Sequence, residues 1–245
     1  MTHSIQYITR VVATECVEAK DVEAWSALES RAIEPNAYLS PHFVLAATRW
    51  LTPDERAKVF FVEKVARDSV ELVGVGVFSE SGPTKQLPIR TLAGYRSRHS
   101  FLSGLLLDRE WAVPALRALL DSVSDVLPQC KAVVIPSVWN DGALATASEA
   151  DAQAFEHKPR ISNLVPRAIL IPSEVEALLS DKALASRIRD LDRRQRRLRD
   201  KGKVSWRCLQ GESLSADVVE HFLALEHMGC DACGNAVESI CANGQ

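Results

Sequence analysis

Loose alternation of apolar and polar side chains predicts a series of β-strands in the first half of the chain. These segments are rich in β-branched and aromatic residues, which is typical of strands with one buried face. They are residues 4–17, 58–65, 69–78, 87–94 and 100–107, and a short apolar run at 131–138 predicts a buried strand. We expect residues 58–65 and 69–78 to form an antiparallel pair, because only a few residues join them.

Apolar residues spaced three and four apart predict helices between these strands. In the first helix Trp25 and Leu28 lie on the same predicted face, and in the second Ser40 is the N-cap before Pro41. The predicted helices are residues 19–33, 40–51, 112–127 and 140–155. Because strands and helices follow one another in mixed order, this half of the chain predicts a mixed α/β fold.

A segment with two prolines and little periodicity, residues 158–166, separates two predicted units. We therefore place a first domain at residues 1–165 and a second at residues 166–245. In the second domain, predicted strands at 167–171 and 203–209 alternate with predicted helices at 173–202 and 213–229. After Gly229 the periodic pattern ends.

The composition is that of an ordinary globular protein, with 47% hydrophobic and 25% charged residues. A net charge of −3 argues against nucleic-acid binding by the chain as a whole. The first residues lack the basic start and apolar core of a signal peptide. No apolar run approaches the roughly 18 residues that a membrane span needs. We expect a cytoplasmic protein with no membrane span.

Three of the six cysteines lie in the stretch HMGCDACGNAVESIC near the C-terminus. Cys230 and Cys233 form one pair of possible zinc ligands, but His221 and His227 are six positions apart on a predicted helix and point in different directions. A redox Cys-x-x-Cys gains its reactivity at a helix N-terminus, whereas this one follows a helix. We expect neither a metal site nor a redox site here. The other cysteines are expected to be small buried side chains: Cys16, Cys130 and Cys208.

Residues 187–203 carry nine Lys or Arg against three Asp, a local charge of +6. Such a segment can bind phosphate backbones. An apolar stripe runs along one side of the predicted helix, which instead indicates a helix that packs on its domain, and no aromatic residue is interleaved for base stacking. The stripe is Leu184, Ile188, Leu191 and Leu198. Nucleic-acid binding through this helix remains a minor alternative.

Between two apolar runs, residues 92–104 gather several polar and aromatic side chains. A polar loop between strands is a typical ligand site, and a histidine there can act as a base near neutral pH. We therefore predict Tyr95, Arg98 and His99 as substrate-binding residues and His99 as a catalytic candidate. A solvated hairpin is the alternative. The sequence contains no glycine-rich phosphate loop, no H-E-x-x-H and no G-x-S-x-G.

The second half carries LDRRQRRLRDKGKVSWRCL at 191–209 and VVEHFLALEHMG at 218–229. It resembles the acyltransferase domain of bacterial GNAT-like proteins linked to cellulose and exopolysaccharide biosynthesis. Leu225, Glu226 and Gly229 match that family's Leu-Glu-x-x-Gly phrase, whereas Cys230 and Asp231 stand where it has Trp and Lys. GNAV at 234–237 echoes its Gly-Thr-Ala-Leu phrase.

The first half resembles the same family in AWSALESRAIEPNAYLSPHFV at 24–44 and in RHSFLSGLLL at 98–107. The resemblance spans about residues 20 to 237. It implies a GNAT-like mixed sheet flanked by helices, followed by an incomplete second GNAT-like unit in a C-terminally truncated chain. It also implies transfer of an acyl group from acetyl-CoA or another acyl-CoA to an amine or hydroxyl, with a small-molecule or polysaccharide-pathway substrate. Glu226 is a second catalytic candidate on this ground.

In that family the CoA pyrophosphate rests on the backbone N–H groups of an Arg/Gln-x-x-Gly-x-Gly/Ala turn, at the start of the helix after a central strand. The nearest string here is RDKGKV at 199–204, which lacks the last glycine and follows a helix. We therefore assign no cofactor-binding residue.

Two hypotheses follow from the resemblance and from this missing turn. The chain is either a GNAT-type acyltransferase or a catalytically inactive accessory, partner-binding protein. On either hypothesis we expect the chain to self-associate through the helix at residues 215–227.

Overall fold

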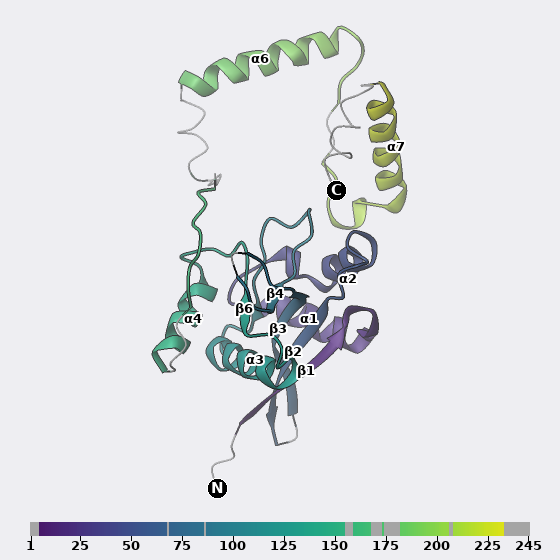
Figure 1. The fold of residues 1–245 in the computed structure, drawn as a ribbon. Coiled ribbons are helices and arrows are strands. Elements are labelled where there is room, and N and C mark those ends of the chain that lie inside the picture. Colours follow the sequence, from purple (N-terminus) through teal and green to yellow (C-terminus); the bar gives the residue numbers. More distant parts are fainter. Residues whose placement is uncertain are drawn as a thin grey trace. The chain divides into compact units, whose positions relative to one another are not determined.

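The computed structural model describes residues 5–67, 69–85, 87–154, 159–167, 173, 182–205 and 208–232. The chain divides into two compact units, Met1–Pro166 and Arg167–Gln245, and each is described by itself (Figure 1). In the described ranges, no helix has both the length and the apolar character that a membrane span requires.

The first unit is built on one mixed sheet in the order β1-β2-β3-β4-β6, with β5 paired to β3 beside β4. All pairs are antiparallel except β4 with β6, which run parallel. The strands are β1 Gln6–Ala13, β2 Lys58–Ala66, β3 Ser69–Ser81, β4 Thr91–Gly94, β5 Leu106–Leu107 and β6 Ala132–Val134. The predicted antiparallel pair is confirmed as β2 and β3.

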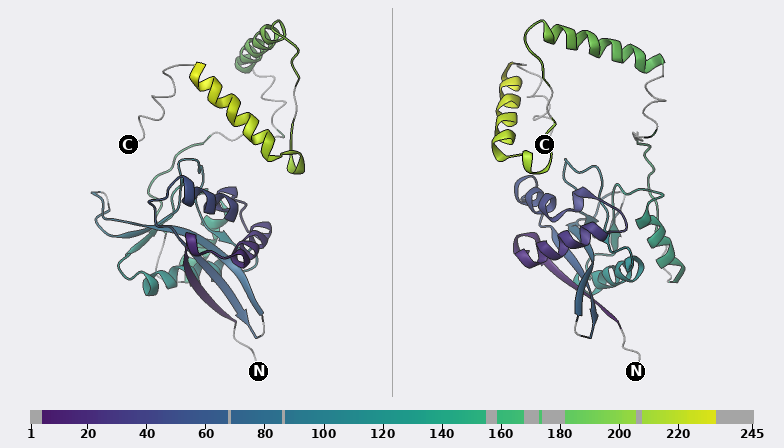
Figure 2. Two further views of the ribbon diagram at one scale, coloured as in Figure 1. Left: turned by 90° about the vertical axis from the view of Figure 1, so that its right-hand side faces the viewer. Right: turned by 180° about the vertical axis from the view of Figure 1, so that it is seen from behind.

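Helices cover both faces of this sheet (Figure 2). Alternate residues of β2 enter two separate cores: Phe60 and Val62 pack in one, Val59 and Phe61 in the other. The first core also takes side chains from α3 and α4, and the second from α1 and α2. The helices are α1 Ala19–Arg31, α2 Pro41–Trp50, α3 Ala112–Val126 and α4 Ala143–Ala154, with short 3₁₀ turns η1 Thr14–Cys16 and η2 Ala37–Leu39. The predicted fold class, a mixed sheet flanked by helices, is confirmed.

β3 contains two glycines, Gly74 and Gly76, in the string LVGVGVF. At Gly76 the missing side chain serves the packing of the core and not a phosphate-binding loop. A Cβ at this position would lie 2.4 Å from Cε2 of Phe78 and 3.0 Å from Cδ1 of Leu119 on α3. Such distances are far below ordinary van der Waals contact, so glycine is what lets α3 approach the strand.

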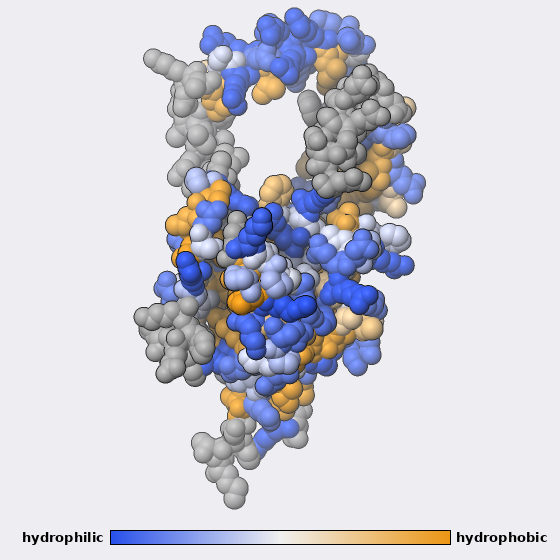
Figure 3. Space-filling model, viewed as in Figure 1, coloured by the Kyte–Doolittle hydropathy of each residue, from blue (hydrophilic) through white to orange (hydrophobic). Residues whose placement is uncertain are grey.

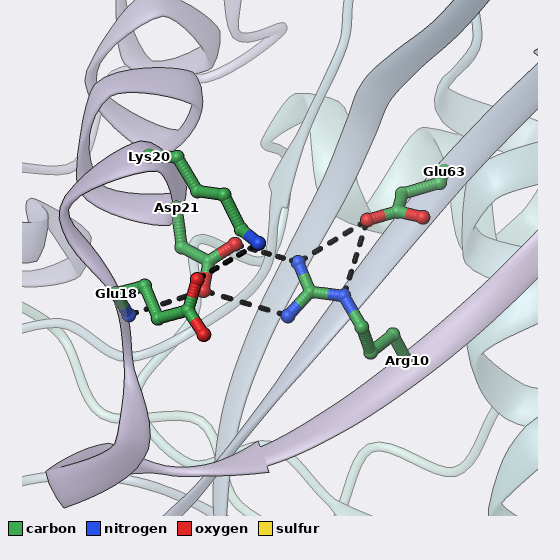
Figure 4. A network of polar contacts seen from close by, with 5 residues as sticks. All are labelled: Arg10, Glu18, Lys20, Asp21 and Glu63. Carbon is green, nitrogen blue, oxygen red and sulfur yellow. Dashed lines mark hydrogen bonds and ion pairs between the residues drawn. The ribbon is translucent and has the colours of Figure 1, made fainter.

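An ionic network fixes the start of α1 to the sheet (Figure 4). Arg10 on β1 donates to Oδ1 of Asp21 at 2.7 Å and to Oε1 of Glu63 on β2 at 3.2 Å. Asp21 also accepts the N–H of Glu18 in a capping box, so one carboxylate closes the helix N-terminus and holds the guanidinium. The same guanidinium lies 4.7 Å from the ring centre of Phe61.

Replacing Asp21 by asparagine is expected to lower the free energy of unfolding by about 1–2 kcal/mol at neutral pH, since Arg10 is partly exposed. Burial by itself raises the pKa of Asp21, but the hydrogen bonds from Arg10 and from the Glu18 N–H, with the nearby positive charges, outweigh it and lower that pKa. A depressed pKa stabilises the fold above the ordinary aspartate value of about 3.9, and this contribution disappears as pH falls through the lower folded value. Urea unfolding at several pH values should show the difference between the two proteins shrinking in acid. A difference that stays constant into strong acid would contradict the ionic role.

The structure corrects two strand predictions and part of the cysteine prediction. Residues 100–107 form a strand only at Leu106–Leu107, because the preceding residues turn away from the sheet. Among the described residues of 203–209, none is in a strand: no strand partner lies beside them in the described part of the second unit. Cys130 is buried as predicted, and burial raises the pKa of its thiol, whereas Cys16, at the end of η1, which buries none of its residues, and Cys208 are exposed.

The described part of the second unit is helical. It contains α6 Lys182–Arg199, the 3₁₀ turn η4 Gly211–Ser213 and α7 Ala216–Ala232. The predicted strand at 167–171, apart from its first residue, lies outside the described residues, as do Cys233, Cys241 and the GNAV string. A second GNAT-like unit therefore stays a prediction.

Candidate functional site

The strand that pairs with β3 on the side opposite β2 is interrupted, and β4 and β5 are its two parts. Gly94 pairs with Phe78, and the Tyr95 N–H still reaches the carbonyl of Val77 at 2.8 Å. Pairing with β3 resumes only at Leu106, which lies opposite Val75. From Phe78 to Val75 the chain of β3 advances three positions, whereas its partner advances twelve positions from Gly94 to Leu106. The partner therefore has nine more residues than the pairing needs, and these leave the sheet. We call residues 96–105 the excursion loop.

Three buried serines hold the excursion loop in place. Ser97 and Ser100 share a hydroxyl–hydroxyl hydrogen bond of 3.0 Å, and the Ser100 N–H donates to the Ser97 carbonyl in a tight turn. Ser103 Oγ donates to the Tyr95 carbonyl at 3.2 Å, which ties the end of the loop to its beginning. Gly104 has a φ of 138°, a conformation that L side chains rarely adopt. The loop therefore has a defined shape of its own.

Two further segments meet the excursion loop where the parallel strands β4 and β6 end. After β6, Ser137 accepts Arg96 Nη1 on its hydroxyl at 2.7 Å and the Ser103 N–H on its carbonyl at 3.2 Å. From the α1–α2 connection, Asn36 Nδ2 donates to the Ser103 carbonyl at 3.1 Å, and the ring of Tyr38 lies 6.0 Å from that of Phe101. In sheets with parallel strands, ligands commonly bind beyond the carboxyl ends of those strands.

Besides Gly104, Ser137 has an unusual backbone conformation in this region. Its φ of 55° is left-handed, which is uncommon for a residue other than glycine and which clusters at functional sites. We define the loop site as the group Tyr38, Arg96, Arg98, His99, Phe101 and Ser137. Its members combine cationic groups, an imidazole and aromatic faces, the groups that bind polar or anionic ligands with a flat face.

The three predicted substrate-binding residues have different environments. Arg98 and His99 occupy the exposed tip of the tight turn. Tyr95 is only 3% exposed, and its hydroxyl shares a 2.9 Å hydrogen bond with Thr52. Burial, chiefly, raises the pKa of Tyr95. Its role is therefore to anchor the base of the loop, because its hydroxyl already has a partner inside the protein.

Sequence reasoning missed Tyr38, Phe101 and Ser137. Phe101 is 68% exposed, which is unusual for an aromatic side chain on a well-held loop. Tyr38 belongs to the PNAYLSP phrase at 35–41 that carries the family resemblance, so that phrase was the signal that could have found it. Ser137 lies outside every motif, and only the register of β6 brings it to the site.

Glu226 lies on α7 in the second unit and is exposed. His99 lies in the first unit. The two catalytic candidates are thus on separate units, and each is considered alone.

A CoA pyrophosphate would be expected at the start of α3, since α3 is the helix that follows β5, the second part of the interrupted strand. Asp108 occupies this turn: its carboxylate accepts the Glu110 N–H at 2.9 Å and Arg31 Nε at 2.6 Å. A second acidic residue, Glu110, adjoins it, and Pro114 removes an N–H donor at the third helical position. Segment 108–114 contains no glycine. Negative charge and a missing donor oppose anion binding, so these residues do not fit a pyrophosphate.

A cavity of about 360 Å³ lies between the first turns of α3 and α4. Small side chains such as Ala112, Ala143 and Ala147 form much of its wall, and Glu110 and Arg109 stand at its edge. Its apolar lining accommodates a chain of methylene groups better than a phosphate.

Within the described residues, no group of three or more histidine, cysteine or acidic side chains is placed to hold a metal ion. Of the C-terminal cysteine cluster only Cys230 falls in a described element, α7.

No protein-family model matches the chain, and no curated protein matches it significantly. Solved structures of acetyltransferases do match part of it. A Trypanosoma brucei acetyltransferase is 10% identical and covers 66% of this chain and 100% of its own, with a TM-score of 0.35. A ribosomal-protein-alanine N-acetyltransferase from Brucella melitensis is 17% identical over 65% of this chain and 99% of its own, with a TM-score of 0.36.

An aminoglycoside N-acetyltransferase in complex with CoA is 16% identical and covers 69% of this chain and 98% of its own, with a TM-score of 0.36. Likeness at these scores does not carry a function from one protein to another. The proposals that follow therefore rest on the contacts within this chain and on the family resemblance of its sequence.

Proposed function

We propose that this chain serves a GNAT-type acyl transfer, in which an acyl group passes from an acyl-CoA donor to an amine or hydroxyl acceptor, and that the loop site binds the acceptor. The observation that carries the proposal is the interruption between β4 and β5, which both pair with β3. Its excursion loop, held by Ser97, Ser100 and Ser103, lies beyond the carboxyl ends of the parallel pair β4 and β6.

The chemistry of the loop site suits a small polar acceptor, and a sugar of a polysaccharide pathway is the acceptor class that the family resemblance suggests. Arg96 and Arg98 would orient oxygen atoms of the acceptor, and the ring of Phe101 beside Tyr38 would contact its apolar face. His99 is our candidate for taking the proton from the acceptor amine or hydroxyl, since a neutral imidazole nitrogen can accept a proton. Glu226, on α7, is a separate catalytic candidate that the family resemblance suggests for the second unit.

The start of α3 does not fit the pyrophosphate of the donor, because Asp108 and Glu110 are acidic and Pro114 lacks an N–H. We propose that residues 166–245 belong to a second unit of GNAT type.

The acidic turn at the start of α3 favours a second candidate function. If the chain binds no acyl donor, it is an accessory protein that holds an acceptor or a partner without catalysis. The observation that supports this accessory function is that the Asp108 carboxylate already occupies the N-terminus of α3.

Acetyl-CoA is expected to show no binding to the purified chain at micromolar concentrations in titration calorimetry. The physical reason is that the start of α3 carries the Asp108 carboxylate and the acidic Glu110 and lacks an N–H at Pro114. A single-site isotherm on a monodisperse monomer would contradict this expectation.

Reconstitution separates the two candidate functions. The chain is mixed with the separately purified donor-binding domain of a related acyltransferase, and CoA release from acetyl-CoA is measured with amine and hydroxyl acceptors. If the loop site binds the acceptor, His99→Ala should lower kcat by about 100-fold or more, and Arg98→Ala should raise KM for the acceptor. The exposed His42→Ala serves as the matched control. Activity that neither loop variant changes would overturn the acceptor role, and binding of an acceptor without any turnover would establish the accessory function.

A further inference from the structure

Helix α6 carries an apolar stripe in which Leu184 and Ile188 are half-buried and Leu191 and Leu198 are exposed to solvent. Leu184, Ile188, Leu191, Gln195 and Leu198 follow one another at steps of four and three, so they lie on one side of the helix. Leu191 is 62% exposed and Leu198 is 51% exposed. The expectation that this stripe packs on its own domain is therefore wrong for these two residues in the described part of the chain. A helix whose apolar face packed against its own domain would not leave two leucines more than half exposed.

Outside this stripe the segment is strongly cationic. Residues 187–203, which extend four residues past the end of α6, contain seven Arg and two Lys against three Asp. Asp190 is already paired with Arg193 and Arg194. Helical spacing places Arg187 and Arg194 along one border of the apolar stripe and Arg199 along the other. Figure 3 shows the helix as a mainly hydrophilic surface with hydrophobic side chains gathered along one side.

Three kinds of partner can be weighed against this arrangement. In a pair of α6 helices from two copies, the stripes would bring rows of arginine next to each other, and like charges at these borders repel. A nucleic acid would neutralise the arginines but would leave Leu191 and Leu198 in water, and it would find no aromatic residue to stack on. A membrane surface with anionic lipids accepts both groups at once, since leucines enter the headgroup boundary while long cationic side chains reach the phosphates.

We propose that α6 is an amphipathic helix that binds the surface of anionic lipid membranes, lying flat with its apolar stripe toward the lipid. A strongly cationic polar face, few apolar residues overall and leucines gathered on one side are the features of such interfacial helices. The helix lies on the membrane and does not cross it, in agreement with the absence of a spanning helix in the described residues. This inference concerns the second unit and does not depend on the proposed acyl transfer.

The test is sedimentation of the full chain with vesicles of phosphatidylcholine and phosphatidylglycerol in equal parts, compared with vesicles of phosphatidylcholine alone. We expect binding to the anionic vesicles only, and we expect salt to weaken it, because the attraction is largely electrostatic. The double variant Leu191→Ser/Leu198→Ser and the double variant Arg187→Gln/Arg194→Gln should each weaken binding by about tenfold or more.

The matched control is Arg193→Gln/Arg197→Gln, which removes the same charge from the opposite side of the helix and should change binding by much less than either. Circular dichroism shows whether each variant keeps its helix, and binding is compared only between variants of equal helicity. Equal binding to both kinds of vesicle, or no binding to the anionic ones, would overturn the proposal. Binding to mixed-sequence DNA that the leucine changes leave intact would assign α6 to nucleic acid. A dimer in light scattering that the same changes dissociate would assign it to a second copy of the chain.

Discussion

Replacing Trp25 by alanine should destabilise the first unit by about 3–5 kcal/mol, the range measured for large aromatic side chains removed from packed cores. Trp25 is fully buried, and its ring meets that of Phe61 edge-on with centres 5.8 Å apart. Its indole N–H donates to the Leu39 carbonyl at 2.8 Å. The substitution thus removes apolar contacts and leaves a buried carbonyl without its donor. Urea denaturation followed by circular dichroism measures the loss.

Trp50→Ala is the matched control, because it deletes the same side chain where it is 71% exposed. Its stacked neighbour Arg49 lies 4.9 Å from the ring centre, so we expect a cost of no more than about 1 kcal/mol. Equal losses for the two variants would show that Trp25 does not join α1 to the sheet. The Trp25 variant should also loosen the connection at 32–40 and with it the position of Tyr38 in the loop site.

Asp108→Ala should cost about 2–4 kcal/mol, because it removes a carboxylate that accepts both a backbone N–H and the Arg31 guanidinium. Arg31 is partly exposed and keeps the Leu72 carbonyl as an acceptor at 2.7 Å, which holds the cost below that of a fully buried pair. Denaturation of the single variants and of the Asp108/Arg31 double variant gives the coupling energy. Asp121→Ala, at an exposed position on α3, is the control.

The same variant also tests the account of the α3 N-terminus. Even without the carboxylate, acetyl-CoA binding should not appear at micromolar concentrations, since Glu110 stays acidic and Pro114 still lacks an N–H. If Asp108→Ala binds acetyl-CoA, the internal carboxylate alone was blocking a donor site. If it has the stability of the unaltered chain, the 2.6 Å contact to Arg31 contributes nothing.

Much of the first unit could be predicted from local patterns. The helix with Trp25 and Leu28 and the strands around Phe60 and Val75 repeat their apolar residues with the period of one element, so each can be recognised without its neighbours. The excursion loop could not. Its string SFLSGLLL is apolar enough for a strand, but Ser97, Ser100 and Ser103 satisfy one another and the backbone, and Gly104 turns the chain at a positive φ.

The candidate site shows the same division. Arg98 and His99 could be named from the sequence because they stand together in a polar segment between apolar runs. Ser137 could not be found, because it comes to Arg96 only through the parallel pairing of β4 with β6. Tyr95 looked equally accessible in the sequence, yet its ring packs in the second core and its hydroxyl hydrogen-bonds to Thr52, forty-three residues earlier.

The sequence by itself determined the mixed α/β class, the antiparallel pair β2–β3, the amphipathic character of α1 and α3, and the cationic face of α6. Each of these depends on side-chain order within one segment, where periodicity is sufficient. Only the tertiary structure decided that the chain leaves the sheet between β4 and β5, that Asp108 binds Arg31 at the start of α3, and that Leu191 and Leu198 are exposed. These features depend on contacts between residues far apart in the chain, because the register of a sheet and the burial of a side chain are set by the partners that pack against them.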